Sequence, residues 1–406
     1  MNKVKIINDP VYGFLRFPEQ EVIQIINHPW FQRLRNIKQM GLAHLVYPGA
    51  MHSRLHHSLG ACHLMGKALD ELKAKGIEIS NDEYVAARIA ILLHDIGHTA
   101  FSHSLENLIA PNTSHETISH IIMRKLDKEF NGMLSQAIQI FDSSFQKKYL
   151  HQLVSSQLDV DRMDYLNRDS FYTGVSEGVI GYDRILQMLT VQNNELMVEE
   201  KGVHSVEKFI IARRLMYWQV YLHKTVLGTE QLLINIFKRA KELAQDKIEL
   251  FTTPALRHFL YRKEELKTAD FEENDEHLKR FCELDDSDVY TCIKVWQEHK
   301  DDVLSTLSKM LVLRKLYKVL LSSQSLASIL KEKRETIQKM AGVYSKHLDY
   351  FVFDGTTSNN TYNINDERIA IAMKDGSVKD ISEIDNSLIN QTLSGPIHKN
   401  YICYIQ

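Results

Sequence analysis

The chain contains 406 residues, of which 44% are hydrophobic and 25% are charged, and its formal net charge is −3. This length allows more than one hydrophobic core, and the composition is that of an ordinary globular protein. The slightly acidic balance argues against nucleic acid as a partner, and the apolar runs are far shorter than the roughly 20 residues that span a bilayer.

Four cysteines, Cys62, Cys282, Cys292 and Cys403, lie far apart and form no CxxC pair. This spacing is typical of thiols in a reducing compartment rather than of a disulfide scaffold or a zinc site. The first residues also lack the apolar segment and small-residue cleavage site of a secretory signal. We therefore expect a cytoplasmic protein without membrane contact.

Helix-forming residues recur along most of the chain and only seven prolines interrupt them, which predicts a mostly α-helical fold. In chain order, we expect helices from near residue 56, over 82–94, after a capping Ser114, and over 153–168, 206–224 and 230–244. Helical periodicity continues, with more charged residues, beyond residue 249.

The pattern changes near residue 350, where short apolar runs at 351–353, 369–372 and 378–381 predict strands. Lys374-Asp375-Gly376-Ser377 lies between the last two runs and predicts a hairpin turn, because glycine accepts a positive φ. We therefore expect three regions: a helical core at 1–245, a helical extension at 246–344 and a small β-containing appendage at 345–406.

Histidines are concentrated in one part of the chain: ten of the nineteen lie between His44 and His120. Among them, His94-Asp95 ends an apolar helix, where an imidazole nitrogen and a carboxylate oxygen can bind the same divalent cation. His57 and Asp161 are candidates to complete an octahedral site that leaves room for water. The alternative is that His94 is an ordinary buried histidine and Asp95 a helix-end carboxylate.

Two sets of polar residues recur at helical spacing. Arg213, Tyr217, Tyr221 and Lys224 are separated by four, four and three residues, and Asp161, Tyr165 and Asp169 by four and four. Each set should share one helix face, because residues three or four apart are neighbours on a helix. Arginines such as Arg54 and Arg213 bind phosphate oxygens in a bidentate manner, so the first face suits a pocket wall for a phosphorylated ligand. The alternative is a solvated amphipathic helix.

Four segments combine these features: FQRLRNIKQ at 31–39, RLHHSLG at 54–60, HDIGHTAFSH at 94–103 and DVDRMDYLNRD at 159–169. In their order and spacing, and together with residues 213–224, they resemble the HD-domain phosphohydrolases. Within that superfamily the resemblance is to the deoxynucleoside-triphosphate triphosphohydrolases, including the SAM-and-HD-domain dNTPases. It covers roughly the first 240 residues, which would form the HD phosphohydrolase core.

The resemblance implies a metal site and a catalytic group. It places the metal ligands at His57, His94, Asp95 and Asp161, with His56 as an alternative to His57, and catalytic residues at His98, Glu106 and His115. The family usually has Asp where this chain has Glu106, which leaves the role of that longer side chain open. The ligand set accepts one Mn, Fe, Mg or Zn ion without distinguishing among them, and a second Mg²⁺ on the substrate phosphates is a further option.

The resemblance also implies a substrate pocket. In this interpretation Arg54 and Arg213 bind phosphates, Tyr165 and Asp169 bracket the deoxyribose, and Tyr217 and Tyr221 form a wall. Gln39 and Met40 match positions at the sugar edge that screen against a 2′-hydroxyl. Leu222 occupies a position near the base but offers no hydrogen bond, so base discrimination through it should be weak.

Some family members are switched on by a nucleotide bound between subunits. Lys5, Asn8, Gln32 and Arg35 match parts of that regulatory site, whereas Asn27 stands where an acidic residue reads a guanine activator. The alternative is that Gln32 and Arg35 only pack a subunit or domain contact. We also expect a homo-oligomer, a dimer or a tetramer.

The sequence therefore predicts a mostly α-helical HD fold that hydrolyses a dNTP to the deoxynucleoside and inorganic triphosphate. One rival is an HD phosphohydrolase that acts on another nucleotide phosphoester. A second is a catalytically idle nucleotide sensor, and a single-stranded nucleic-acid binder is a third and weaker idea because aromatic-basic repeats are absent from the sequence.

Overall fold

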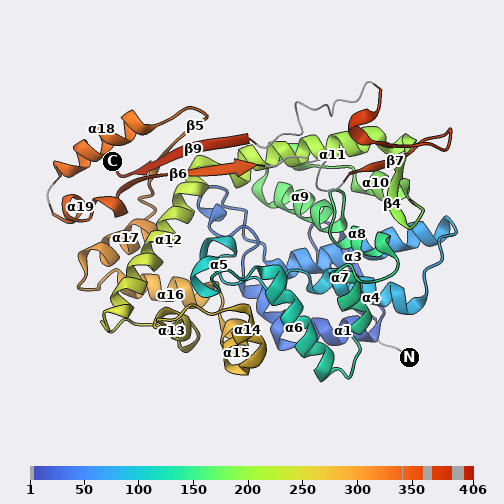
Figure 1. Ribbon diagram of the computed structural model, residues 1–406, viewed down its shortest axis with the longest axis horizontal. Coiled ribbons are helices and arrows are strands. Elements are labelled where there is room, and N and C mark those ends of the chain that lie inside the picture. The colour runs from blue at the N-terminus through green and yellow to red at the C-terminus, as the bar shows by residue number, and fades with distance from the viewer. Residues whose placement is uncertain (1–3, 341, 360–367, 386–396) are drawn as a thin grey trace.

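The computed structural model describes residues 4–340, 342–359, 368–385 and 397–406 (Figure 1). The prediction of a mostly α-helical fold is confirmed. The first twelve helices are α1 (Gln20–Asn27), α2 (Pro29–Gln32), α3 (Arg54–Ala74), α4 (Asn81–Leu93), α5 (His103–Ile109), α6 (His115–Glu129), α7 (Ser135–Phe141), α8 (Lys148–Val154), α9 (Val160–Thr173), α10 (Tyr182–Met188), α11 (Val203–Met216) and α12 (Lys224–Gln245). The remaining helices are α13 (Pro254–Leu260), α14 (Thr268–Glu273), α15 (Asp275–Glu283), α16 (Asp286–Trp296), α17 (Asp302–Val312), α18 (Ala327–Gln338) and α19 (Val343–Lys346).

Helix α3 is the centre of the first half of the molecule, packed against both α4 and α9. Its start is set by Ser53, which forms a capping box with His56, two residues earlier than the sequence predicts. Helix α4 begins with a second capping box, between Ser80 and Glu83, and α6 begins after the predicted cap Ser114. These caps satisfy the free amides of the first turns and so fix where the helices begin.

Two predicted helices are interrupted. The expected helix over 153–168 is wrong in one respect: it is divided into α8 and α9, because the Asp159 carboxylate accepts hydrogen bonds from the backbone of Ser156 and Arg162 and caps a new helix. The expected helix over 206–224 ends at Met216, continues as a π-helical turn over Tyr217–Tyr221 and stops before α12. Its end matters for the site, since the π turn sets the direction of two tyrosines.

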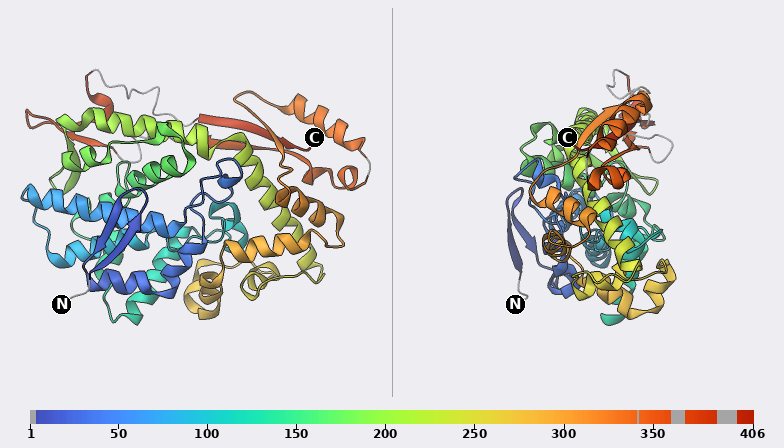
Figure 2. Two further views of the ribbon diagram at one scale, coloured as in Figure 1. Left: turned by 180° about the vertical axis from the view of Figure 1, so that it is seen from behind. Right: turned by 90° about the vertical axis from the view of Figure 1, so that its left-hand side faces the viewer.

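The strands form three small sheets. They are β1 (Lys5–Asp9), β2 (Gly13–Phe17), β3 (Leu189–Gln192), β4 (Glu195–Glu199), β5 (Lys318–Ser322), β6 (Val352–Asn359), β7 (Ala370–Ala372), β8 (Val378–Asp380) and β9 (Ile397–Tyr404). β1 and β2 form an antiparallel hairpin that lies against one flank of the helices (Figure 2). The order β3-β4-β7-β8 contains one parallel pair, β4 with β7, whereas the order β5-β9-β6 is antiparallel throughout.

The C-terminal strands join sheets that begin earlier in the chain. The β7–β8 hairpin, with the predicted turn at Gly376 (φ 85°), pairs with β4, and β9 pairs with both β5 and β6. Figure 1 shows β6 and β9 side by side at the end of the molecule that carries α12 and α18. Phe351 and Ile402 belong to the same continuous hydrophobic cluster as the residues of α3 and α4.

Within the described part of the chain, no helix combines the length and the apolar character that crossing a bilayer requires.

Candidate metal centre and substrate pocket

Four side chains from three parts of the chain meet at one point. His57 comes from α3, His94 and Asp95 follow α4, and Asp161 lies in the first turn of α9. His57 Nε2 lies 3.0 Å from Asp161 Oδ1, 3.3 Å from His94 Nε2 and 3.7 Å from Asp95 Oδ2. His94 Nε2 lies 3.4 Å from both Asp161 Oδ1 and Asp95 Oδ1.

These separations fit a shared cation. An ion held about 2.1 Å from each ligand places neighbouring ligand atoms about 3.0 Å apart in an octahedral and about 3.4 Å apart in a tetrahedral arrangement. His57, His94 and Asp161 thus form one group of candidate ligands, and the fourth predicted ligand, Asp95, adjoins this group and also groups with His98 and His115. His56, the alternative to His57, is turned away, since its Nδ1 accepts a hydrogen bond from the Ser53 amide in the capping box.

The two imidazoles are oriented for coordination by their other nitrogens. His57 Nδ1 donates to Asp164 Oδ2 at 2.8 Å, and His94 Nδ1 donates to the Ile91 carbonyl at 2.6 Å. Because each Nδ1 donates to its own acceptor, Nε2 is the nitrogen that each ring has left for a cation, and the two Nε2 atoms lie 3.3 Å apart in a buried site. The residues present therefore fit a divalent metal ion.

Electrostatics at this point also favour a cation. Burial opposes charge on His57, yet its hydrogen bonds to Asp161 and Asp164 raise its pKa to about 10. Burial likewise disfavours ionised Asp161, but hydrogen bonds from both histidines hold the pKa of Asp161 well below its usual range. Burial also opposes ionisation of Asp95, but the charges of His94 and of Arg54, which forms an ion pair with Asp95, lower the pKa of this carboxyl well below its usual value. Two ionised carboxylates at one point provide the negative charge that a divalent ion neutralises.

A row of two histidines and one acid adjoins Asp95. His98 Nε2 lies 3.3 Å from Asp95 Oδ1, and the His115 ring stacks on the His98 ring with centroids 3.9 Å apart. Glu106 Oε1 accepts hydrogen bonds from the His115 amide at 2.7 Å and from His115 Nδ1 at 3.2 Å. The structure thus joins Glu106 to His115 and His115 to His98. Burial, followed by the Arg54 charge, lowers the pKa of His98 well below its ordinary value, so its ring is neutral near pH 7.

The loop after Asp95 is built by close approaches and strained backbone. A Cβ at Gly97 would lie 2.1 Å from the His115 carbonyl oxygen, so only glycine allows α6 to come this near. Phe101 and Ser102 have positive φ angles of 53° and 51°, a backbone conformation that residues other than glycine rarely adopt. The strained turn places Ser102 Oγ 3.0 Å from Arg54 Nε and 2.7 Å from Arg54 Nη2, and so fixes the guanidinium beside Asp95.

A pocket of about 580 Å³ opens in front of this centre. Eleven of the predicted site residues line it: Gln39, Arg54, Asp95, His98, His115, Asp161, Tyr165, Asp169, Arg213, Tyr217 and Tyr221. His57 and His94 approach Asp161 from behind the wall, and Glu106 supports His115 from outside the lining. Met40 also lines the pocket, but Lys224 and Leu222 are not among the lining residues. The prediction that Lys224 shares a face with Arg213 is wrong, because the π turn ends that helix and Lys224 begins α12.

Asp169 is held between two donors at the pocket wall. His52 Nε2 lies 2.7 Å from Asp169 Oδ1, and the Tyr221 hydroxyl donates to Asp169 Oδ2 at 2.7 Å. Burial, then the negative charge of Asp169, raises the pKa of Tyr221 well above its usual value, so this phenol stays protonated. Tyr165 and Tyr217 each meet the Tyr221 ring edge-on, at centroid distances of 6.2 and 5.2 Å. The predicted face of Asp161, Tyr165 and Asp169 does point into one pocket.

Sequence reasoning missed three ionisable residues of this pocket region. Arg162 lines the pocket beside Asp161, His52 orients Asp169 from a fully buried position, and Glu230 lines the pocket from α12. Burial alone raises the pKa of Glu230 to about 7. The adjacency of Arg162 to Asp161 was a usable signal, but neither His52 nor Glu230 lies within a segment that carries the family pattern.

The predicted regulatory residues lie apart from the pocket, at the base of the β1–β2 hairpin. Lys5 Nζ donates to Asn27 Oδ1, Arg35 Nε donates to Gln32 Oε1 at 2.5 Å, and Gln32 Nε2 donates to the Ile26 carbonyl at 2.5 Å. Lys5 and Arg35 are close enough for the Arg35 charge to add to burial in lowering the pKa of Lys5. Asn8 is exposed on the hairpin.

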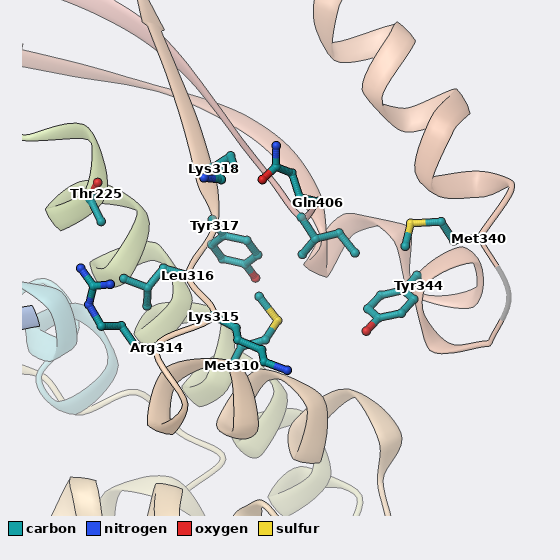
Figure 3. Close-up of a pocket in the computed structure, with 11 residues that line it drawn as sticks. Thr225, Met310, Arg314, Lys315, Leu316, Tyr317, Lys318, Met340, Tyr344 and Gln406 are labelled. Carbon is teal, nitrogen blue, oxygen red and sulfur yellow. The ribbon is translucent and has the colours of Figure 1, made fainter.

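A second cavity, of about 560 Å³, lies between the α17–β5 connection and α19 (Figure 3). Arg314, Lys315 and Lys318 contribute its cations, and Tyr317 and Tyr344 contribute aromatic walls. None of the predicted site residues lines this cavity, so the chemistry assembled above belongs to the first pocket.

Comparison with known protein families agrees with this geometry. Residues 54–169 match the HD domain and residues 180–256 match the HD associated region. The two matched ranges contain all four ligands of the candidate metal centre, as well as Arg213, Tyr217 and Tyr221 of the pocket.

Individual relatives extend the likeness over the whole chain. A phosphohydrolase from Bacteroides thetaiotaomicron, known from its crystal structure, is 48% identical with a TM-score of 0.94, and each chain is covered completely. The uncharacterized protein YwfO of Bacillus subtilis is 29% identical over 100% of this chain and 92% of its own length. A Dictyostelium discoideum homolog of the deoxynucleoside triphosphate triphosphohydrolase SAMHD1 is 30% identical over 60% of this chain, which spans about half (51%) of that relative. This chain belongs to the HD-domain phosphohydrolase family.

Proposed function

We propose that this protein hydrolyses deoxynucleoside triphosphates at the α-phosphate, releasing the deoxynucleoside and inorganic triphosphate. One observation carries the proposal. A single pocket contains two metal-ligand carboxylates, three arginines (Arg54, Arg162 and Arg213) and the Tyr221–Asp169 pair. A dNTP presents matching groups: phosphates for a cation and for guanidinium groups, and a sugar hydroxyl for a carboxylate. The SAMHD1 relatives support this substrate class.

The phosphate end of the pocket is cationic. The Arg54 guanidinium is fixed by Ser102 and Asp95, while Arg213 Nη1 donates to Gln157 Oε1 at 3.0 Å and keeps its remaining donors for a ligand. A divalent ion held by His57, His94, Asp95 and Asp161 would act as a Lewis acid that polarises the α-phosphate and lowers the pKa of nearby water. These charges offset the negative charge that develops on the phosphoryl oxygens.

In the hydrolytic step a water oxygen forms a bond to the α-phosphorus, and the bond between that phosphorus and the 5′-oxygen breaks. The leaving 5′-oxygen takes a proton, and triphosphate carries the oxygen that came from water. We assign His98 as the side chain that donates this proton. Its ring is neutral in the free protein because of burial and Arg54, and substrate phosphates that neutralise Arg54 favour its protonation. His115, held by Glu106 and stacked on His98, keeps the ring in position.

The nucleoside end selects the sugar. Asp169, oriented by His52 and Tyr221, can accept a hydrogen bond from a 3′-hydroxyl, and Tyr165 lies beside it in the same wall. Gln39 and Met40 lie on the lining, where they would leave little room for a 2′-hydroxyl. A hydroxyl-binding carboxylate of this kind discriminates strongly against substrates that lack the hydroxyl, because the buried acceptor is then left unpaired.

We also propose that the cluster of Lys5, Gln32 and Arg35, with Asn8 on the adjoining hairpin, binds an activating nucleotide in a homo-oligomer. Two cations and an amide group lie close together here, which supports the binding of an anionic ligand. Asn27 accepts from Lys5 and carries no charge, so the activator need not be a guanine nucleotide.

The test is hydrolysis of each of the four dNTPs and four rNTPs by protein loaded in turn with Mn²⁺, Fe²⁺, Mg²⁺ or Zn²⁺, with products separated by chromatography. The proposal predicts deoxynucleoside and triphosphate from dNTPs and little turnover of rNTPs. Nucleoside monophosphates, or no dNTP turnover under any metal with and without added nucleotides, would contradict it.

A further inference from the structure

A chain of buried charges connects the N-terminal hairpin to the candidate metal centre. Arg168 Nη1 donates to Asp9 Oδ2 at 2.7 Å, and on its other edge Nε and Nη2 donate to the two oxygens of Asp164 at 2.9 and 3.0 Å. Asp164 Oδ2 in turn accepts from His57 Nδ1 at 2.8 Å. The series therefore runs from Asp9 in β1 through Arg168 and Asp164 in α9 to His57 in α3.

Every member of this series is removed from solvent. The exposed side-chain fraction is 2% for Asp9 and 0% for Arg168, Asp164 and His57. Ion pairs at such depth lack solvent screening, and an unpaired charge there is strongly unfavourable. The position of Asp164 is therefore determined by Arg168, and Arg168 in turn needs Asp9 as its second partner.

The surroundings leave this geometry no freedom. A Cβ at Gly60 would lie 2.0 Å from Asp164 Oδ1 and 2.2 Å from Arg168 Nη2, so α3 approaches the pair as closely as its backbone allows. The Tyr12 ring covers the guanidinium of Arg168 at 5.4 Å. Asp9 Oδ1 accepts from the amides of Val11 and Tyr12, so the turn of the hairpin fixes the carboxylate that holds Arg168.

We infer that Asp9 and Arg168 are positioning residues of the metal centre: the docked β1–β2 hairpin holds Asp164 where it keeps the proton on His57 Nδ1 and aims Nε2 at the metal position. Neither residue lines the pocket or reaches the four ligands directly. The inference rests on the ligand set of the proposed function but not on its substrate. It makes the hairpin, whose outer face carries the proposed regulatory residue Asn8, a structural determinant of metal affinity.

The test compares metal affinity among variants of the full chain. Asp9→Asn keeps the oxygen that accepts from the turn amides and removes the carboxylate charge. Arg168→Lys keeps the positive charge and loses the bidentate guanidinium contact with Asp164, and Arg168→Met removes both. Glu19→Gln is the control, because Glu19 forms a close, largely buried ion pair with Arg88 (2.5 and 2.6 Å) that does not contact a metal ligand. The readouts are the Mn²⁺ dissociation constant from competition with a chelator, bound metal per chain, and the melting temperature of the metal-free protein.

Loss of an outer partner of a ligating histidine typically weakens metal binding about 10- to 100-fold. We expect the Mn²⁺ dissociation constant to rise by that factor in Arg168→Met and several-fold in Asp9→Asn. In Arg168→Lys the rise should be smaller than in Arg168→Met. Glu19→Gln should lower the melting temperature while leaving the dissociation constant unchanged. Should Arg168→Met fail to fold, Asp9→Asn and Arg168→Lys decide the question.

Wild-type affinity in both Asp9→Asn and Arg168→Lys would overturn the inference, as would an equal loss of affinity in Glu19→Gln. Altered affinity in a protein that hydrolyses no dNTP would leave the positioning role standing and reject the proposed substrate. A wild-type chain that binds no divalent metal would reject the ligand set and the positioning role together.

Discussion

The two ends of the proposed substrate pocket are built in contrasting ways. At the metal end, His57 and His94 each have their second nitrogen committed to a hydrogen bond, and Arg54 is held by Ser102 and Asp95. At the nucleoside end, phenol rings meet edge-on, Asp169 accepts hydrogen bonds from two donors, and burial raises the pKa of the Glu230 carboxyl to about 7.

In the proposed function, this contrast separates the groups that carry out the reaction from the groups that select the substrate. In the proposed reaction, the groups that would act on the phosphoester are fixed before a ligand arrives, as preorganised electrostatic catalysis requires. The groups that choose the ligand are few, and each contributes a modest hydrogen bond. Changes at the metal end should therefore abolish the reaction, whereas changes at the nucleoside end should alter its preference or the stability of the fold.

The largest effect is expected for Asp161→Ala. Without this carboxylate the two Nε2 atoms lose the oxygen that lies 3.0 and 3.4 Å from them, so bound metal should fall to a small fraction and turnover by at least about 1000-fold. Metal analysis and product chromatography measure both. Asp183→Asn, which changes an exposed carboxylate paired with Lys67, is the control and should behave as wild type. Full turnover in Asp161→Ala would contradict the assignment of the reaction to the metal end of the pocket.

A second large effect is expected for His98→Ala, which should lower kcat by at least about 100-fold, as loss of a proton-transfer group does. Bound metal should stay at the wild-type level, because His98 lies beside Asp95 rather than among the four ligands. His204→Ala removes a histidine whose side chain is 94% exposed and serves as the control. An unchanged kcat in His98→Ala would remove it from the reaction.

At the nucleoside end, Tyr221→Phe removes one of the two donors that hold Asp169. A single hydrogen bond to a charged group is worth about 1.5 kcal/mol, so kcat/KM for a dNTP should fall about tenfold with metal content intact. The preference for a dNTP over its 3′-deoxy analogue should shrink in parallel, and steady-state kinetics on both substrates measure it. A loss of metal instead would mean that the two ends are not separable.

The smallest effect is expected for Glu230→Gln, and its sign depends on pH. Below about pH 4.5 the carboxyl is protonated in both the folded and the unfolded chain. Between about pH 4.5 and pH 7 the unfolded chain releases this proton while the folded pocket retains it, so stability falls as pH rises and the loss is complete above pH 7.

Glutamine mimics the protonated carboxyl, so the variant should be stabilised at pH 8 by about 1 kcal/mol, or roughly 1–3 °C, and unchanged near pH 4.5. The value allows for partial access of water to the pocket. Thermal melts of the metal-free protein at both pH values measure the difference. A gain of equal size at both pH values would show that the carboxyl is not responsible.

What the sequence could predict follows from how locally each feature is encoded. His94-Asp95 and the segment around Asp161 are contiguous motifs, and all three of these side chains lie within 3.7 Å of His57 Nε2. The turn at Gly376 was also predictable, since one residue type determines it. The β1–β2 strands were missed, because a two-stranded hairpin has too few residues to show a period.

Other features depend on tertiary packing that no spacing reveals. The partners of Asp164 and Arg168 lie 107 and 159 residues away along the chain, at His57 and Asp9. Lys224 was placed on the wrong face because helical spacing assumes an uninterrupted helix, and the π turn over Tyr217–Tyr221 violates that assumption. Glu230 could not be identified, because its significance arises from burial in the pocket rather than from any neighbour in sequence.

The measurement that tests the central claim most directly is hydrolysis of a dNTP in ¹⁸O-labelled water, with mass analysis of each product. The account predicts triphosphate carrying one ¹⁸O atom and an unlabelled deoxynucleoside, because water attacks the α-phosphorus and the 5′-oxygen leaves with the sugar. A labelled deoxynucleoside monophosphate, or label in a released monophosphate, would place the cleavage at another bond and contradict the account.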